Sequence, residues 1–526
     1  MQGHFNRMKF YWFCGWKWRL LLSFCAMESS GYLLGIDLGS SSVKASLVDV
    51  RSGGTKQSSQ SPSEEMPMIS LQPGWAEQDP ATWWEHTVKS VRAAVEKSQV
   101  DPSQILAVGI SYQMHGLVIV GKDHQPLRPA IIWCDSRAVP HGEQAFKSLG
   151  ENFCLNHYLN SPGNFTAAKL RWVKENEPAL FNKINKIMLP GDYLAMKMTG
   201  EIVTTDTGLS EGILWDFKEN AIASDLLTNF EINENLLPKV VPVFSSQGTL
   251  SESAANELGL KKGTIISYRA GDQPNNAFSL NVLNPGETAA TAGTSGVIYS
   301  VTEKNAFDVH SRVNTFIHVN NDAHAKRNGV LLCVNGTGIL NSWLRKNLKG
   351  SGAAFDYAQM NQFAAATPVG AEGLSFLPFG NGAERILKNR SINSSIHGLD
   401  FNQHNQSHIL RAAQEGIVFA LKYGFEILQE MGLRTSIIRA GYANMFLSPL
   451  FREAFVNTIG AAVELYDTDG AKGAALGAGI GAGIYRTSGE AFQGLHLIES
   501  QRPDPALTEK YLKAYGRWKN ILKNQL

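Results

Sequence analysis

The chain has 526 residues, with 48 Lys and Arg against 47 Asp and Glu, and its formal net charge is +1. A balanced charge creates no global field that would draw the protein to nucleic acid or to an anionic membrane surface. We therefore expect a small-molecule partner, with no nucleic-acid or membrane role. At ~150 residues per domain, the length predicts two large domains or three smaller ones.

The five cysteines are odd in number and widely spaced, and no two of them form a C-x-x-C pair. This usage predicts neither a disulfide framework nor a zinc site, and it fits a reducing cytoplasm. A homodimer is our hypothesis for the assembly.

Residues 1–30 are expected to be a leader outside the native fold. Basic and aromatic residues precede the short apolar stretch 20–26, which resembles a poor signal peptide. The stretch is far below the ~20 apolar residues of a membrane span. Met27 stands five residues before the first predicted strand, so our hypothesis is that Met27 is the natural start.

The first predicted element is a β-hairpin over residues 31–50. An apolar run ends at residues 39–42 (Gly-Ser-Ser-Ser) and resumes over 43–48, which is typical of two strands joined by a tight turn. Such a turn lets backbone N–H groups and hydroxyls approach an anion, because glycine has no Cβ. Asp37 at its mouth would repel a phosphate unless a cation lay between them, which suggests Mg²⁺ held largely through water. An ordinary Gly-Ser hairpin is the alternative.

A polar, Ser-rich connection over residues 51–70 and a helix starting near Trp83 lead to a buried strand over 105–111. Gln113, Met114 and His115 form its polar tip. A histidine there can bind a hydroxyl and a methionine can supply an adaptable apolar wall. The alternative is a purely structural histidine.

A second apolar strand, over residues 264–270, leads directly into Gly271 and Asp272. Asp272 is the strongest catalytic candidate, because a carboxylate at a strand end can accept the proton of a substrate hydroxyl during phosphate transfer. The alternative is an Asx-turn in which the side chain caps its own backbone.

The tight turn recurs at residues 293–296 (Gly-Thr-Ser-Gly), 254 residues after Gly39, and it is again followed by an apolar run. Two copies in matching contexts favour a pair of phosphate loops on duplicated domains. An Asn-Pro-Gly boundary signal at 284–286 separates an N-terminal domain, 31–283, from a C-terminal domain, 284–500, with a C-terminal helix over 501–526. Late in the second domain, the glycines and alanines of a helix over 473–483 predict close backbone packing.

Together these motifs resemble the FGGY carbohydrate kinase family over nearly everything from Gly31 to the C-terminus. The motifs that carry the resemblance are GIDLGS (35–40), WAEQDP (75–80), QMHG (113–116), WCDSR (133–137), GNFTAAKL (163–170), GD (271–272) and GTSG (293–296).

The resemblance implies an α/β chain with the actin-like ATPase (ribonuclease H-like) fold, in which two duplicated domains enclose a catalytic cleft. It implies ATP-dependent phosphorylation of a sugar, with ATP and Mg²⁺ as cofactors. The QMHG motif points to D-xylulose as substrate, phosphorylated on its C5 hydroxyl to D-xylulose 5-phosphate.

By the same resemblance Asp272 is the general base, and Asp37 serves Mg²⁺. The implied sugar-binding residues are Gln113, Met114, His115, Asp272 and Gln273. The implied nucleotide-binding residues are Gly39, Ser40, Ser41, Thr294, Ser295, Gly338, Gly441 and Asn444.

Two departures from the family pattern leave alternatives open. Tyr442 stands in a turn that is usually rich in glycine and could stack on the adenine or crowd it. Asp272-Gln273 is closer to the glycerol kinase branch, so the alternative is a kinase of another ketose or polyol, such as ribulose, rhamnulose or glycerol. A non-catalytic sugar- or nucleotide-binding regulator is the alternative from a different class.

Overall fold

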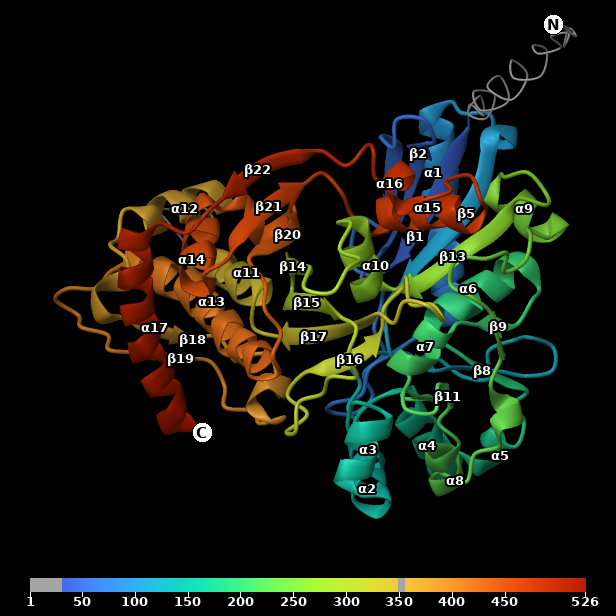
Figure 1. The fold of residues 1–526 in the computed structure, drawn as a ribbon, viewed down its shortest axis with the longest axis horizontal. Coiled ribbons are helices and arrows are strands. Elements are labelled where there is room, and N and C mark those ends of the chain that lie inside the picture. Colours follow the sequence, from blue (N-terminus) through green and yellow to red (C-terminus); the bar gives the residue numbers. More distant parts are fainter. Residues whose placement is uncertain (1–30, 349–354) are drawn as a thin grey trace, which may run out of the picture.

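A computed structural model of the chain describes residues 31–348 and 355–526 (Figure 1). The predicted leader and start at Met27 lie outside the described residues. Within those residues, none of the helices combines the length and apolar character needed to cross a membrane.

The N-terminal half is built on a five-stranded sheet in the order β13-β5-β1-β2-β3. Its strands are β1 (Tyr32–Leu38), β2 (Val43–Asp49), β3 (Thr55–Ser61), β5 (Ile105–Tyr112) and β13 (Ile265–Gly271). Strands β1 and β2 form the predicted hairpin around Gly39, and β5 and β13 run parallel to β1. The polar, Ser-rich connection over residues 51–70, for which no strand was predicted, contains β3, which pairs with β2.

The second half repeats this arrangement within a seven-stranded sheet in the order β16-β17-β15-β14-β20-β21-β22. Its strands are β14 (Thr288–Ala292), β15 (Gly296–Thr302), β16 (Asn314–Ile317), β17 (Asn328–Val334), β20 (Ile437–Gly441), β21 (Ala462–Tyr466) and β22 (Leu497–Gln501). The hairpin β14–β15 corresponds to β1–β2, while β20 and β21 are parallel to β14 as β5 and β13 are to β1. The two halves therefore share five corresponding strands as well as the duplicated turn.

Helices cover both sheets. The longer ones are α1 (Pro80–Ser98), α2 (Val139–Leu149), α4 (Thr166–Asn176), α6 (Pro190–Thr199), α10 (Asp272–Ser279), α11 (Gly338–Asn347), α12 (Tyr357–Ala365), α13 (Gln406–Glu430), α14 (Pro449–Ile459), α15 (Gly470–Gly481) and α17 (Pro505–Gln525). Shorter ones are α3 (Glu151–His157), α5 (Pro178–Phe181), α7 (Asp206–Glu211), α8 (Ser224–Asn229), α9 (Glu252–Leu258) and α16 (Ser488–Ala491). In Figure 1 the red helix α15 lies beside the blue strands of the first sheet, away from the strands β20 and β21 that precede it in the sequence.

Helix α15 follows a strand of the second sheet but packs on β1, β5 and β13 of the first. A Cβ built at Gly35 on β1 would lie 1.8 Å from the carbonyl oxygen of Ala471, and one at Gly109 on β5 would lie 2.0 Å from that of Ala474. Backbone therefore meets backbone, as the small residues of this helix predicted. The matching helix α10 follows β13 and contacts β14 and β15 of the other half.

Replacing Gly109 by alanine tests this contact. The new methyl group would overlap the α15 backbone, which cannot move aside as a flexible side chain would, so we expect a loss of about 1–3 kcal/mol or more. Thermal unfolding should show a melting temperature several degrees below the wild type. Gly516→Ala in α17 is the control: its Cβ meets open space, and alanine favours the helix by about 1 kcal/mol. Equal melting temperatures for Gly109→Ala and the wild type would contradict the packing.

Candidate active site

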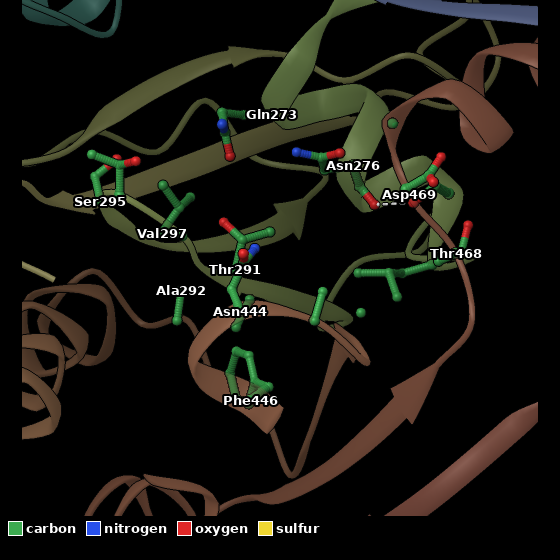
Figure 2. Close-up of a pocket in the computed structure, with 18 residues that line it drawn as sticks. Gln273, Asn276, Thr291, Ala292, Ser295, Val297, Asn444, Phe446, Thr468 and Asp469 are labelled. Carbon is green, nitrogen blue, oxygen red and sulfur yellow. Dashed lines mark hydrogen bonds between the residues drawn. The ribbon is translucent and has the colours of Figure 1, made fainter. Parts of the chain in front are cut away.

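Two adjoining cavities lie between the two halves, and they share Gln273, Ser295 and Val297 in their walls. The first has a volume of about 450 Å³ and the second about 330 Å³. Figure 2 shows the second cavity, with Gln273 and Asn276 of α10 on one side and Asn444 and Phe446 on another. The cavities bring together segments from both duplicated domains.

The structure divides the predicted site residues between these cavities. The first is lined by Gly39, Ser40, Ser41, Gln113, Met114, His115, Asp272 and Gln273, the predicted first phosphate loop and sugar residues. The second is lined by Thr294, Ser295, Gly441 and Asn444, the predicted nucleotide residues. Ser295 of the second loop also reaches the first cavity, so both loops border the space in front of Asp272.

Two predicted site residues, Gly338 and Asp37, lie behind the cavity walls. The N–H of Gly338 donates to the carbonyl of Gly293 at 2.9 Å, and a Cβ on Gly338 would lie 2.2 Å from that oxygen. Gly338 therefore supports the second loop from behind. A Cβ on Gly470, the first residue of α15, would lie 2.3 Å from Asp37 Oδ2.

The carboxylates near the first loop suit a hydrated cation better than a cage of protein ligands. Among the described residues no cluster of three or more His, Cys, Asp or Glu side chains could hold a metal. Burial raises the pKa of Asp37 to about 6, with a further contribution from the negative charge of Asp469. A Mg²⁺ ion bound through water and substrate phosphates would relieve this repulsion. The residues present thus fit such an ion.

Tyr442 is 43% exposed and is absent from the residues lining either cavity, whereas Gly441 and Ala443 on each side of it line the second. The side chain of Tyr442 therefore does not narrow the second cavity.

Asp272 is the first residue of α10, directly after β13. Burial, together with the nearby charge of Asp37, raises its pKa to about 7, although Gln273 Nε2 donates to Asp272 Oδ2 at 3.1 Å and opposes the shift. A carboxylate with a pKa near neutrality is well matched to accept a proton from a hydroxyl.

His115 is held in one tautomer. Its Nδ1 lies 2.8 Å from the carbonyl oxygen of Glu211, which can only accept, so Nδ1 carries the proton. Burial lowers the pKa of His115 to about 3, so the ring is neutral and Nε2 is left as an acceptor. The ring packs edge-on against Phe165 at 4.9 Å. Its backbone φ of +60° is uncommon for a residue with a Cβ, a strain typical of functional positions.

Gln78, which sequence reasoning quoted only as part of a motif, joins the first loop to the sugar residues. Its Nε2 donates to the carbonyl of Ser40 at 2.7 Å, and its Oε1 accepts from Gln113 Nε2 and from Trp83 Nε1, each at 3.1 Å. This amide thereby fixes the spacing between the loop and the tip of β5. A glutamine just before a helix gave no local sign of this role.

Glu211 is a second residue that the sequence did not single out. Its side chain is fully buried, neither carboxyl oxygen has a hydrogen-bond partner among the described residues, and a Cβ on Gly271 would lie 2.3 Å from Oε2. Burial and the charge of Asp272 hold its pKa well above the usual range. Glu211 therefore lies beneath the strand end that carries Asp272, and a side chain at position 271 would displace the carboxyl group of Glu211 or the side chain of Met114.

Comparisons with known proteins agree with this geometry. Residues 32–279 match the N-terminal domain, and residues 288–484 the C-terminal domain, of the FGGY family of carbohydrate kinases. The chain is similar to the xylulose kinase of Bacillus subtilis, with 30% identity over 499 residues that cover 93% of this chain and 96% of that one.

Solved structures show the same fold. The xylulose kinase of Rhodospirillum rubrum superposes with a TM-score of 0.82 at 24% identity, covering 94% of this chain and 98% of that one. The glycerol kinase of Plasmodium falciparum, solved with ADP, gives 0.82 at 21% identity and the same coverage. The predicted actin-like ATPase fold, with its two sheet-containing domains, is confirmed. By its domains, its fold and its relatives, this chain belongs to the FGGY family of carbohydrate kinases.

Proposed function

We propose that the protein transfers the γ-phosphoryl group of ATP to the C5 hydroxyl of D-xylulose, with Asp272 as general base. The observation that carries the proposal is the placement of Asp272 in one cavity with the sugar-site residues Met114 and His115 and with both phosphate loops. Relatives named xylulose kinase, such as that of Bacillus subtilis, support the choice of sugar.

In the proposed reaction the C5 oxygen attacks phosphorus, the bond to the β-phosphate oxygen breaks, and ADP leaves. Asp272 accepts the proton of the attacking hydroxyl. Nε2 of His115 accepts a hydrogen bond from another sugar hydroxyl and thereby orients the sugar. The loop at residues 39–42 and the loop at 293–296 present glycine backbone and hydroxyls to the phosphates. Asp37 would hold Mg²⁺ through water, and the ion would supply positive charge to the phosphates.

The proposed setting is a reducing cytoplasm, which the free thiols of Cys134, Cys154 and Cys333 support.

The alternative acceptor is another ketose or a polyol, and the Asp272-Gln273 pair is the observation that favours it. Gln273 lines both cavities, so its side chain lies where it can contact the acceptor. The decisive test is ADP release with ATP and Mg²⁺ across D-xylulose, L-xylulose, D-ribulose, L-rhamnulose, L-fuculose, gluconate and glycerol. We expect selective turnover of D-xylulose. Turnover of another acceptor would move the specificity, and no turnover with ATP still bound would favour a regulator.

In the same assay Asp272→Ala should bind ATP nearly as the wild type does but lose turnover by a factor on the order of 10²–10⁴, because base catalysis is lost. Asp322→Ala, which changes an exposed turn, is the control. Turnover of Asp272→Ala within a few-fold of the wild type would remove Asp272 from the role of base.

His115→Ala should raise the KM for the sugar at least as much as it lowers kcat, because it removes the hydroxyl acceptor Nε2 while leaving the base in place. Steady-state kinetics with the sugar and ATP varied separately measure the two effects. An unchanged KM for the sugar would leave His115 with a structural role only.

The same electrostatics predict a dependence of stability on pH. The pKa of Asp272 rises from 3.8 to about 7 on folding, so the folded state binds this proton more tightly and loses stability as the pH rises between these values. Asp272→Asn removes the ionisation, and its melting temperature should exceed that of the wild type at pH 8 and approach it towards pH 4. At Asp322 backbone N–H groups lower the pKa, so Asp322→Asn should show no such gain. A constant difference across the pH range would refute the raised pKa.

A further inference from the structure

Arg385 reaches the first cavity from the C-terminal half of the chain. It begins the one-turn 3₁₀-helix Arg385–Leu387 and lines the cavity together with Met114, His115 and Asp272 of the N-terminal half. Among the described residues that line this cavity, Arg385 is the one Lys or Arg. Arg385 was not predicted from the sequence. It lies 113 residues after Asp272, so no local pattern connects the two.

The half-buried guanidinium of Arg385 has few hydrogen-bond partners and no carboxylate partner among the described residues. Its Nε is buried without a hydrogen-bond partner, and its Nη2 makes only a long 3.5 Å contact with Ser161 Oγ. No ion pair among the described residues includes it. The neighbouring Asp308 is already bound by Arg312 through both carboxyl oxygens, at 2.8 and 2.9 Å.

Burial lowers the pKa of Arg385 to about 10, so the side chain remains charged at neutral pH despite its incomplete solvation. A charge partly removed from water without a partner is destabilising, and a ligand with acceptor oxygens would offset part of that cost. The structure thus leaves donors in the cavity for which the described protein supplies no acceptor.

The surroundings place Arg385 at the sugar end of the cavity. Its guanidinium carbon stands 5.4 Å from the centre of the Phe165 ring, and Phe165 packs edge-on against His115. The charge of Arg385 also contributes to the lowered pKa of His115. The contacts that the structure shows for its side chain involve Ser161 and Phe165, and neither phosphate loop is among them.

We propose that Arg385 is a further sugar-binding residue, which donates hydrogen bonds to the oxygens at the end of the acceptor that is not phosphorylated. A ketose presents a carbonyl there, which only accepts, beside a hydroxyl, and the planar guanidinium offers two parallel donors to such a pair. The neutral His115 supplies an acceptor and Arg385 the complementary donors. This assignment rests on the proposed sugar kinase function.

The variants Arg385→Met and Arg385→Lys test the assignment, with Arg327→Met as the matched control. Arg327 likewise has a buried, unpartnered Nε but lines neither cavity. With whichever acceptor the wild type phosphorylates, Arg385→Met should raise the KM for the sugar by about 10–100-fold, as expected for a lost charged hydrogen bond. The KM for ATP should change by less than about two-fold, because the proposed hydrogen bonds of Arg385 go to the sugar and not to ATP. Arg385→Lys should restore part of the sugar affinity.

A second readout separates recognition from structure. The wild type should prefer a ketose to the polyol of the same carbon chain, because only the ketose has the carbonyl, and Arg385→Met should lose most of this preference. Sugar-induced thermal stabilisation should fall in the same variant. Arg385→Lys keeps the charge but not the planar fork. Should Arg385→Met fail to fold, a reduced preference for the ketose over the polyol in Arg385→Lys would support the assignment, and an unchanged preference would contradict it.

An unchanged KM and preference in the Arg385 variants would overturn the proposal. So would a change confined to kcat and the KM for ATP, since that result would assign Arg385 to the phosphoryl group. If the wild type phosphorylates no acceptor, the proposed function fails on its own. Thermal stabilisation of the wild type and of Arg385→Met by D-xylulose then tests the contact independently, and equal shifts would overturn it.

Discussion

The close contact between the backbone of α15 and the strands β1 and β5 is the constraint on which the rest of the molecule depends. Glycines 35 and 109 are required there because any larger residue would meet carbonyl oxygens of the helix. The contact brings the start of α15 against Asp37, and Asn275 Nδ2 donates to the carbonyl of Gly470 at 2.9 Å. One short segment therefore joins α10, the first hairpin and the second sheet beside the cavities that the loops at residues 39–42 and 293–296 border.

Around this point the protein gathers buried carboxylates whose negative charges lie close together. Burial raises the pKa of both Asp37 and Asp272, and the charge of Asp469 adds to the first shift and that of Asp37 to the second. His115 is neutral and cannot offer a positive charge. Such an arrangement is costly in the empty protein. It suits a reaction in which a base is needed near neutral pH and the compensating cations arrive with the nucleotide.

Much of the fold could be predicted because its signals are local. Both hairpins and the strand before Asp272 follow from apolar runs that stop at glycine, and these predictions are confirmed. β3 was missed because it is polar: it is an edge strand held by pairing with β2 and by the 2.7 Å contact between the Ser46 and Ser58 hydroxyls. Its strand character comes from its neighbour and not from its own residues.

The candidate site was predictable only in part, for a similar reason. Asp272 and His115 stand at strand ends, where the sequence marks them. Glu211 and Arg385 reach the same space from distant segments, and their importance lies in missing partners, which no local pattern records. The small residues of α15 predicted close packing, yet nothing near them in the sequence identified the first sheet as the surface that receives them.

The packing of α15, a helix of the second half, on the sheet of the first half also affects folding during synthesis. The last strand of the first sheet ends at Gly271, but the helix that covers its face starts at Gly470, roughly 200 residues later. At a synthesis rate of about 5–20 residues per second, α15 is made on the order of 10–40 s after the strand whose face it covers. During this interval the apolar residues beneath α15, Leu33 and Ala107 among them, are open to solvent or to chaperones. During synthesis, one face of the first sheet is therefore completed only when the end of the second half has been made.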